Sequence, residues 1–588
     1  MKLGTTSLLG ATLSAAVAGT AAAGNVVDVT DDITTSTTWT ADNVYNLTTQ
    51  IFVKDGATLT IEPGTRIASD PTENGAGSLA ITRGSKIEAL GTADEPIVFT
   101  SAADDGTWRA AATEWGNLTI MGQAYISENV QPLGFPPNSP VPSPSNRALM
   151  EGLIADDVNA TEDVVYGGGN DDDNSGTLNF VSFRYGGRVI GLADELNGLS
   201  MGGIGRETDV QYVEIMNNVD DGIEIWGGTV DVKYFSIWNV GDDSFDVDQG
   251  WRGRGQFGVI VQGYSLVGES QGSGAGDNAF EIDGAEDSFW QPVTTTTLYN
   301  LTVIGQPGTD GLTTWRDNAR VQYRQSIFME SGGQIVRNDG DDGDGASGYG
   351  AEGTLTFDET WNAPYTEFSQ VNAPSNPEDF YTVQFSGNLA EITDSVFYNV
   401  GSLTNGAAAG IEGLLTSAAS DNVDLSGSQD LGDRPIVAID RDLTDIDGDG
   451  IPGYTTPQGD LFLRVNSVDL RPAGAALTSA SSAPADSDFW CPRTYRGAYG
   501  PNENWLAGWT AAAEYGFIAT PGGFSVDPCG NEPPADCPTD LDGNGETDFN
   551  DLLAVLNGFG TADGDVNGDG VTDFEDVLGV LNAFGPCP

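Results

Sequence analysis

The chain contains no histidine among its 588 residues. This absence excludes Ser-His-Asp hydrolysis, histidine-dependent zinc sites and every imidazole general base. Lysine is also scarce, with single residues at positions 2, 54, 86 and 233. Any catalysis must therefore use carboxylates, arginine, lysine, tyrosine or a bound metal ion. Beyond the N-terminus no stretch approaches the roughly eighteen uninterrupted apolar residues of a membrane span, so no transmembrane segment is predicted.

Positive charge is in short supply throughout. The chain has 23 Lys and Arg against 87 Asp and Glu, a formal net charge of -64 and a pI near 4.1. This balance argues against nucleic acid or an anionic membrane as a partner, and favours calcium and cationic or neutral partners. Because 39% of the residues are hydrophobic and 12 are Trp, the chain can still bury a large core. We therefore expect an acidic globular protein.

The N-terminus has the pattern of a secretory signal peptide. Lys2 supplies a positive charge, residues 3–17 form a short apolar stretch, and small residues follow at 21–24. This pattern predicts a signal peptide over residues 1–23, removed near Gly24. The mature protein is expected outside the cell, either secreted into the medium or on the cell surface.

Cysteine is rare, and all four residues lie late in the chain: Cys491, Cys529, Cys537 and Cys587. In an exported protein an even number favours disulfides. A bond between Cys537 and Cys587 would join the two ends of the C-terminal segment, and Cys491 would then pair with Cys529. A zinc site of four thiolates is the alternative, but the short paired spacings that zinc prefers are missing.

A twelve-residue pattern occurs twice near the C-terminus, at 540–551 and again at 565–576. Oxygen ligands at positions 1, 3, 5, 9 and 12, a backbone carbonyl at position 7 and a Gly at position 6 are typical of a calcium loop. The predicted Ca²⁺ ligands are Asp540, Asp542, Asn544, Glu546, Asp548 and Asp551 in the first loop, and Asp565, Asn567, Asp569, Val571, Asp573 and Asp576 in the second. The alternative is a solvated acidic tail, which would not place Gly and Asx at matching offsets twice.

Each loop leads into one short apolar helix, whereas a full EF-hand has a helix on both sides. Position 12 is Asp in both loops, Asp551 and Asp576, where the EF-hand pattern has Glu. In these features residues 537–588 resemble the type I dockerin module, which shares the Asp at position 12. The resemblance implies a small α-helical domain that folds around calcium and attaches the chain to a cohesin-like protein.

Most of the remaining chain consists of short β segments separated by Gly, Asp and Asn. A motif recurs after 22 residues, Asp220-Asp221-Gly-Ile223-Glu224-Ile225 and Asp242-Asp243-Ser-Phe245-Asp246-Val247, and a third copy follows an insertion and begins at Asp277. This interval is typical of one coil of a parallel β-helix, whereas a propeller blade needs about twice as much. Strand alternation predicts that Ile223, Phe245 and Phe280 point inward and that Glu224, Asp246 and Glu281 point outward.

Residues 44–525 resemble a family of secreted bacterial proteins with a right-handed parallel β-helix. Matching elements are Ala57-Thr-Leu-Thr-Ile61-Glu-Pro-Gly64, Glu114-Trp115-Gly116, Arg496-Gly-Ala-Tyr-Gly500 and Asn504-Trp-Leu-Ala-Gly-Trp509. The resemblance implies an all-β solenoid. It implies no particular activity, because none is established for that family. We expect it over residues 24–525, with a Pro-rich loop at 128–146, an acidic loop at 338–345 and a linker at 526–536 before the domain at 537–588.

Outward carboxylates on neighbouring coils repel each other by roughly 3 kcal/mol per pair at a spacing of about 4.8 Å and an effective dielectric constant of about 20. A bound cation, nearby arginines or raised carboxyl pKa values would relieve this repulsion. A bound cation would have a structural or ligand-binding role, whereas raised carboxyl pKa values are typical of an acid catalyst.

Asn218-Val-Asp220-Asp221-Gly followed by Gly241-Asp242-Asp243 resembles two motifs of the polygalacturonases, which are inverting β-helix hydrolases. The resemblance implies that Asp242 or Asp243 protonates the leaving oxygen and that Asp221 activates water. The chain departs from the pattern because it has no Gly-His-Gly and no Arg-x-Lys element. Alternatively the repeated Asp pairs are turn residues that hydrogen-bond the backbone, which the third copy favours.

Two further hypotheses concern sugars. A calcium-dependent polysaccharide lyase would need Arg or Lys as the base, and an outward tryptophan such as Trp226 could stack on a sugar ring without any reaction. We expect a secreted, calcium-binding β-helix protein with a docking module and a carbohydrate-related binding or surface role. The alternative is a polysaccharide-degrading hydrolase or lyase on the same scaffold.

Overall fold

The computed structural model covers most of the chain between residue 24 and residue 586. It describes residues 24–72, 75–129, 133–135, 141–154, 160–191, 194–263, 276–285, 290–309, 311–339, 355–364, 377–384, 386–455, 461–484, 489–527, 529, 539, 541, 546–547, 549–561, 564, 566, 571–583 and 585–586. The predicted signal peptide, most of the predicted linker and acidic loop, and Cys537 and Cys587 lie outside the described residues. The domain boundaries stay predictions.

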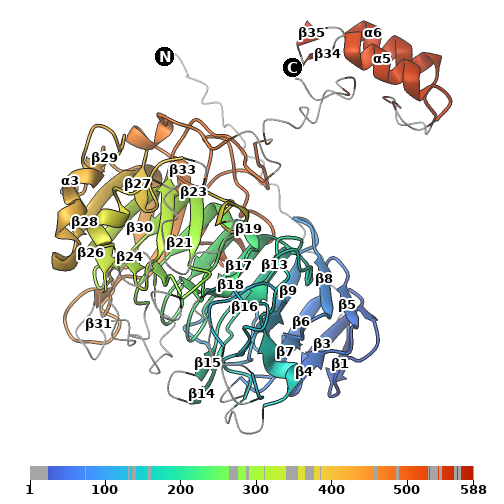
Figure 1. Cartoon of the computed structure of the whole chain (residues 1–588), viewed down its shortest axis with the longest axis horizontal. Coiled ribbons are helices and arrows are strands. Elements are labelled where there is room, and N and C mark those ends of the chain that lie inside the picture. The colour runs from blue at the N-terminus through green and yellow to red at the C-terminus, as the bar shows by residue number, and fades with distance from the viewer. Residues whose placement is uncertain are drawn as a thin grey trace, which may run out of the picture.

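The strands form a right-handed parallel β-helix with three faces. Figure 1 shows its coils one after another along the solenoid, from blue through green to yellow. Face 1 carries the repeated acidic motif, and each of its strands pairs in parallel with the equivalent strand of the next coil. Its strands are β4 (Gln50–Val53), β7 (Ser78–Ile81), β10 (Leu118–Met121), β16 (Leu199–Ile204), β18 (Ile223–Gly228), β20 (Phe245–Asp248), β22 (Phe280–Ile282), β24 (Gly311–Trp315) and the second half of β26 (Ile327–Asn338).

Faces 2 and 3 share five long strands that bend between them: β13 (Gly176–Arg184), β17 (Asp209–Met216), β19 (Asp231–Trp238), β21 (Arg254–Val261) and β23 (Thr295–Ile304). Face 2 is completed by β2 (Thr37–Trp39), β5 (Thr58–Ile61), β8 (Lys86–Leu90), β25 (Arg320–Arg324) and β27 (Glu391–Thr393). Face 3 is completed by β1 (Asn25–Val29), β3 (Asn43–Leu47), β6 (Arg66–Ser69), β9 (Ile97–Ser101), the first half of β26, β28 (Val396–Thr404) and β29 (Val423–Leu425).

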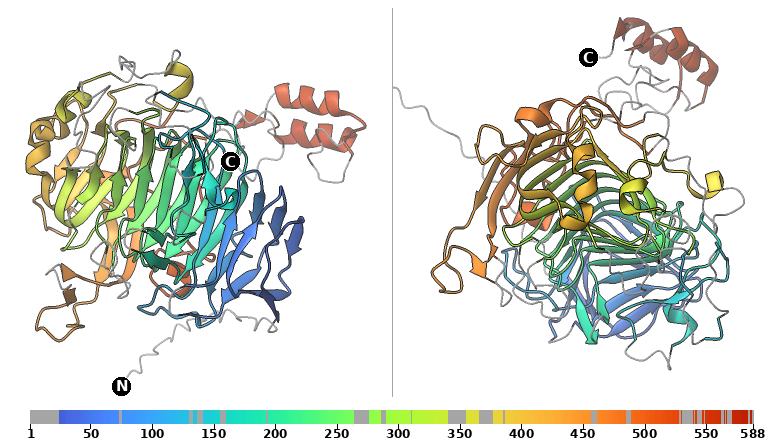
Figure 2. Two further views of the ribbon diagram at one scale, coloured as in Figure 1. Left: turned by 60° about the horizontal axis from the view of Figure 1, so that its bottom comes forward. Right: turned by 60° about the vertical axis from the view of Figure 1, so that its left-hand side comes forward.

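The core runs along the axis of the solenoid, where successive coils stack side by side (Figure 2). The predicted inward residues Ile223, Phe245 and Phe280 are all fully buried, and the rings of Phe245 and Phe280 lie 5.6 Å apart. These residues occupy one register position on β18, β20 and β22. The predicted fold, period and strand orientation are therefore confirmed for these coils.

The bends between faces 2 and 3 are marked by a column of stacked rings. Phe180, Tyr212, Tyr234 and Phe257 each have a positive φ near 55°, and consecutive rings lie 4.2, 4.4 and 4.7 Å apart. Trp505 and Trp509, which belong to the segment 489–527 that follows the last coil, pack edge-on against this column of rings.

The predicted disulfide between Cys491 and Cys529 is present near the two ends of this segment and is confirmed.

The remaining elements are short and lie outside the main sheets. Four antiparallel pairs are β11 (Ala148–Leu149) with β12 (Val165–Tyr166), β14 (Arg188–Gly191) with β15 (Asp194–Leu196), β30 (Ile436–Arg441) with β33 (Val465–Pro472), and β31 (Tyr454–Thr455) with β32 (Leu461–Phe462). The short helices are α1 (Phe357–Thr360), α2 (Pro377–Phe380), α3 (Glu412–Leu415) and α4 (Ala511–Glu514).

The C-terminal segment contains two ten-residue helices, α5 (Phe549–Gly558) and α6 (Phe574–Ala583). They contact each other around the buried Val555, Val577 and Val580. A two-residue pair, β34 (Glu546–Thr547) with β35 (Gly585–Pro586), joins the beginning and the end of this unit. Of the helices that the structure describes, none has the length and apolar character of a membrane span.

Candidate acidic binding site

The repeated motif places eight carboxylates of three adjacent coils on face 1. In each coil the motif supplies side chains at three positions, which are a first turn residue, a second turn residue directly after it and an outward residue of the following strand. We call this set the acidic grid, and it consists of Asp220, Asp221 and Glu224, then Asp242, Asp243 and Asp246, then Asp277 and Glu281. Its ninth position is Asn278, an uncharged residue.

The second turn residues form a hydrogen-bonded ladder along the solenoid. The side chain of Asn197 accepts the backbone N–H of Asp221 at 3.2 Å, and Asp221 Oδ1 accepts that of Asp243 at 2.8 Å. Asp243 Oδ1 then accepts the backbone N–H of Asn278 at 2.6 Å. The turn hypothesis thus agrees with the contacts of Asp221 and Asp243. Because the ladder starts and ends with Asn, its hydrogen bonds alone do not require a carboxylate.

The outward strand residues form a second column next to this ladder. Glu224 pairs with Asp246 in the sheet register, and Asp246 pairs with Glu281. Beyond Glu281 the column continues with the neutral Thr314. Arg316, at the end of β24, forms ion pairs with Glu281 and with Asp283. The guanidinium therefore balances only one end of the acidic column.

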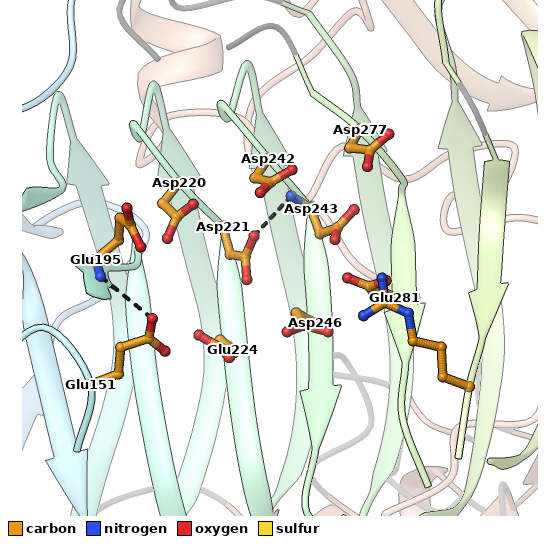
Figure 3. Close-up of a pocket in the computed structure, with 11 residues that line it drawn as sticks. Glu151, Glu195, Asp220, Asp221, Glu224, Asp242, Asp243, Asp246, Asp277 and Glu281 are labelled. Atoms are coloured by element: carbon orange, nitrogen blue, oxygen red, sulfur yellow. Dashed lines mark hydrogen bonds and ion pairs between the residues drawn. The ribbon is translucent and has the colours of Figure 1, made fainter. Parts of the chain in front are cut away.

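The carboxylates line a cavity of about 320 Å³. Figure 3 shows their side chains side by side on neighbouring strands, with Glu151 and Glu195 joining the grid at one end. The Glu195 backbone N–H donates to Glu151 Oε1 at 3.4 Å. The lining therefore has ten carboxylates and a single guanidinium, that of Arg316. Such a lining attracts cations and repels anions.

Carboxylate oxygens in the grid approach each other closely enough to share a metal ion. Within each of three groups, one oxygen per residue lies within 4.8 Å of the others. Calcium binds six to eight oxygens at about 2.3–2.6 Å. Two oxygens on opposite sides of one ion are therefore about 4.6–5.2 Å apart, which matches the spacing in these groups. The donor set, composed only of carboxylates, fits a hard cation. The groups are Asp220 with Asp221 and Asp242, Asp221 with Glu224 and Asp246, and Asp242 with Asp243 and Asp277.

Burial and mutual repulsion shape the protonation of the grid. Desolvation, and then the negative charges of neighbouring carboxylates, raise the pKa values of six grid residues well above their usual range: Asp220, Asp221, Glu224, Asp242, Asp243 and Asp246. Glu224 and Asp243 are 7% and 4% exposed, so solvent cannot screen this repulsion effectively. Without a cation the grid therefore retains protons that solvated carboxylates would lose.

The structure brings the three predicted catalytic residues into this one cavity. Asp221 and Asp243 are second turn residues and lie in the ladder, and Asp242 is a first turn residue beside them. Asp221 and Asp242 each offer an oxygen to the same group, within 4.8 Å. The catalytic acid and base of an inverting hydrolase are about 6.5–9.5 Å apart, which leaves room for a water molecule. The closer approach of the Asp221 and Asp242 oxygens favours a cation shared between them.

Two lining residues, Glu151 and Glu195, were not among the predicted site residues. Glu195 belongs to β15, and Glu151 lies just after β11, both outside the 22-residue repeat. Their only signal in the sequence is their charge, because no period aligns them with the grid. Glu195 lies two residues before Asn197, on the coil adjacent to Asp220 and Asp221, whereas Glu151 lies in a segment inserted before this coil.

The prediction that Trp226 offers an exposed ring is wrong. Trp226 points away from the axis of the solenoid, as alternation requires, but it is only 5% exposed. It packs in an apolar cluster with Ile126, Met150 and Tyr166, whose ring lies 6.2 Å away. These residues belong to segments inserted before the repeat and cover the tryptophan. Stacking of a sugar on Trp226 is therefore excluded by its burial.

The predicted calcium loops are described in part. Leu541 donates its backbone N–H to Asp551 Oδ1 at 2.6 Å, and Val566 donates to Asp576 Oδ1 at 3.0 Å, so the two loops share one contact at the same offset. Glu546 lies in β34, Val571 is exposed, and the Asp573 N–H donates to Asp576 Oδ2. The other predicted ligands lie outside the described residues: Asp540, Asp542, Asn544, Asp548, Asp565, Asn567 and Asp569.

Comparison with known proteins identifies the solenoid. Neither the curated proteins nor the solved structures contain a significant match to the chain. Residues 31–341 match a family model described as a pectate-lyase-like β-helix domain. This match covers more than half of the chain and includes the whole acidic grid. The chain therefore belongs to the pectate-lyase-like β-helix family.

Proposed function

We propose that the protein is an extracellular β-helix protein that binds Ca²⁺ in the acidic grid and, through the bound calcium, an acidic polysaccharide. The observation that carries this proposal is the cavity of about 320 Å³ lined by ten carboxylates and one guanidinium. The name of the family refers to pectate, an acidic polysaccharide. A polyanion would be repelled by the bare grid, so divalent cations must bridge the two.

Cleavage of the bound chain is the second candidate function. The raised pKa values of Asp242 and Asp243 suit a general acid, which supports a hydrolase. A lyase would need a base, and Arg316 is a poor one because the neighbouring Asp283 and Glu281 raise the pKa of its guanidinium. Of the two reactions, hydrolysis therefore has more support, and calcium-mediated binding has more support than either.

Polysaccharide binding should depend on both calcium and the grid. We expect the full chain to bind polygalacturonate in the presence of calcium, with affinity falling at least about tenfold after chelation, because the bridging charge is lost. Asp221→Asn combined with Asp242→Asn should have the same effect in calcium, because each of the three oxygen groups contains at least one of these residues. Affinity electrophoresis with immobilised polygalacturonate and with a neutral glucan measures both effects.

A product assay on the same samples separates binding from turnover. Release of reducing ends would establish hydrolysis, and absorbance of unsaturated products would establish elimination. Binding that is equally strong with and without calcium, or equally strong to the neutral glucan, would contradict the calcium-bridged model. Asp209→Asn with Asp424→Asn provides the matched control, because it removes two exposed carboxylates from β17 and β29.

The fall in stability with rising pH should disappear when calcium is added. Groups with a raised folded-state pKa stabilise the fold below their unfolded pKa, near 4, and lose this contribution as the pH rises through the raised value. In chelator the Tm should therefore fall between about pH 5 and pH 8. In calcium, which binds the ionised carboxylates, the Tm should stay level or rise over that range. Calorimetric scans in both conditions test this, and parallel curves would contradict it.

We further propose that residues 537–588 form a calcium-folded module that docks onto a cohesin-like partner. The support is the duplicated loop and a set of exposed apolar side chains at equivalent positions of the two helices. These are Phe549 and Phe574, Leu553 and Leu578, and Leu556 and Leu581, each between 44% and 68% exposed. A duplicated apolar surface of this kind is typical of a protein interface.

A further inference from the structure

Two further carboxylates lie beside the acidic grid, two residues further along the strands of adjacent coils. Asp248 ends β20, and Asp283 directly follows β22. The backbone N–H of Asp283 donates to the Val247 carbonyl at 2.7 Å, which places Asp283 beside Asp248 in the sheet. By strand alternation both side chains point outward, as Asp246 and Glu281 do. We call these four outward carboxylates, Asp246, Asp248, Glu281 and Asp283, the acidic square.

The next coil places an arginine where the same column would continue. Arg316 directly follows β24, and its backbone N–H donates to the Ile282 carbonyl at 3.0 Å. The backbone N–H of Asp339 in turn donates to the Trp315 carbonyl at 3.1 Å. Arg316 therefore stands between Asp283 and Asp339, in a column that is acidic on both sides of it.

The guanidinium of Arg316 reaches back to the acidic square. It forms ion pairs with Glu281 and, at 3.9 Å, with Asp283, and its Nε lies 4.0 Å from a carboxylate oxygen of Asp339. The side chain of Arg316 is 31% exposed and those of Glu281 and Asp283 are 13% and 18% exposed, so solvent and dissolved ions reach this place. The positive charge therefore lies where a bound cation would lie.

The charges of the guanidinium and of the square depend on each other. Burial disfavours the charged guanidinium, but the negative charges of Asp283 and then Glu281 outweigh it and raise the pKa of Arg316. Burial and the charge of Glu281 raise the pKa of Asp283, and the guanidinium opposes this rise. Arg316 thus relieves carboxylate repulsion in the way that a metal ion would.

The oxygen groups that fit a metal ion end where this arginine begins. On face 1, as far as the structure describes it, three such groups occur, and none of them includes Glu281 or Asp283. All three groups lie on the coils of β18, β20 and the turn before β22. The carboxylates that pair with the guanidinium are therefore the ones that are left out of the groups.

We propose that Arg316 takes the place of a metal ion in the acidic square and thereby ends the row of calcium sites at the coil of β22. This inference rests on the proposed binding of calcium by the acidic grid. Without the guanidinium, Glu281, Asp283 and Asp248 are a set of oxygen donors on two adjacent coils, which suits calcium. Arg316 is a positioning residue, because it limits the surface over which calcium can bridge an acidic polysaccharide.

Counting calcium ions in variants of the full chain tests this role. Each protein carries Asp540→Ala and Asp565→Ala, which remove the first predicted ligand of each terminal loop. Isothermal titration should show one more calcium ion per chain after Arg316→Gln. In chelator Arg316→Gln should have a lower Tm than the natural chain, because the square has lost its counter-charge, and calcium should raise its Tm by more. An unchanged number of ions in Arg316→Gln would overturn the proposal.

Two matched variants separate the position of the charge from its loss. Arg316→Lys keeps a positive charge beside the square and should bind as many ions as the natural chain. Arg471→Gln removes a partly exposed positive charge from β33 and should also leave the number unchanged. An additional ion in either variant would overturn the proposal.

A crystal of Arg316→Gln grown in calcium, with anomalous data, locates the additional ion. We expect a calcium peak between Glu281 and Asp283 that is absent from crystals of the natural chain, and no peak there would overturn the proposal. Calcium in the natural grid with no additional ion in Arg316→Gln would overturn only the role of Arg316. An ion in the square of Arg316→Gln, with none in the natural grid, would instead overturn the proposed function and leave this role standing.

Discussion

Asp221→Asn combined with Asp242→Asn is expected to abolish calcium binding by the solenoid, lowering the affinity at least about 100-fold. These residues take part in all three oxygen groups of the acidic grid, so the pair removes at least one carboxylate from each. A hundredfold loss corresponds to about 2.7 kcal/mol, a modest value for ligands of a hard cation. Isothermal titration of the full chain measures the loss.

The fold should survive both changes. Asn already occupies one position of the ladder, because the Asn197 side-chain oxygen accepts the backbone N–H of Asp221 in the same way as Asp221 accepts that of Asp243. Without calcium the double variant should unfold at a higher temperature than the natural chain, because a buried and a half-buried carboxylate that repel each other are gone. A lower Tm in chelator would mean that the carboxylates themselves hold the coils together, which the proposal does not allow.

The titration must separate the solenoid from the terminal module. Adding Asp540→Ala and Asp565→Ala removes the first predicted ligand of each loop, so any calcium that still binds belongs to the solenoid. Asp209→Asn with Asp424→Asn controls for the loss of two negative charges elsewhere. An unchanged number of bound ions after Asp221→Asn and Asp242→Asn would contradict the assignment of the grid.

Calcium removal is expected to unfold the terminal module while the solenoid stays folded. Among the described residues of the module only Val555, Val577 and Val580 form its buried apolar cluster, with Leu552 and Val566 packed against them. So small a core is marginal on its own, and we expect a bound metal to supply much of the remaining free energy. Asp540→Ala with Asp565→Ala should leave the module unfolded even in calcium.

Limited proteolysis followed by mass spectrometry measures this separately from the rest of the chain. In calcium the region 549–583 should resist cleavage, and in chelator it should be cut while the solenoid remains intact. Capture of a cohesin domain by the full chain should be lost under the same conditions. Equal protection of α5 and α6 with and without calcium would show that the loops do not hold the module together.

The sequence predicts the solenoid well because the fold repeats. One coil sets the register of the next, so a 22-residue interval places Ile223 and Phe245 in the core, and the repeated motif places Phe280 there after an insertion. The same motif aligns the outward Glu224, Asp246 and Glu281. Their convergence in one cavity follows from stacking alone, since equivalent positions of adjacent coils must lie side by side.

The parts of the site that the sequence does not reveal come from segments outside the repeat. Glu151 completes the cavity from an inserted segment, Glu195 does so from the edge of the adjacent coil, and Ile126 and Tyr166 bury Trp226. Alternation gives the direction of a side chain, but it does not show what covers that side chain.

A crystal structure of the full chain in calcium, with anomalous data collected at long wavelength, tests the central claim most directly. We predict calcium peaks inside the acidic grid, at least one of them between Asp220, Asp221 and Asp242 and within about 2.6 Å of their oxygens. The two terminal loops serve as an internal reference for calcium in the crystal. Calcium in those loops together with only water among the grid carboxylates would contradict the account.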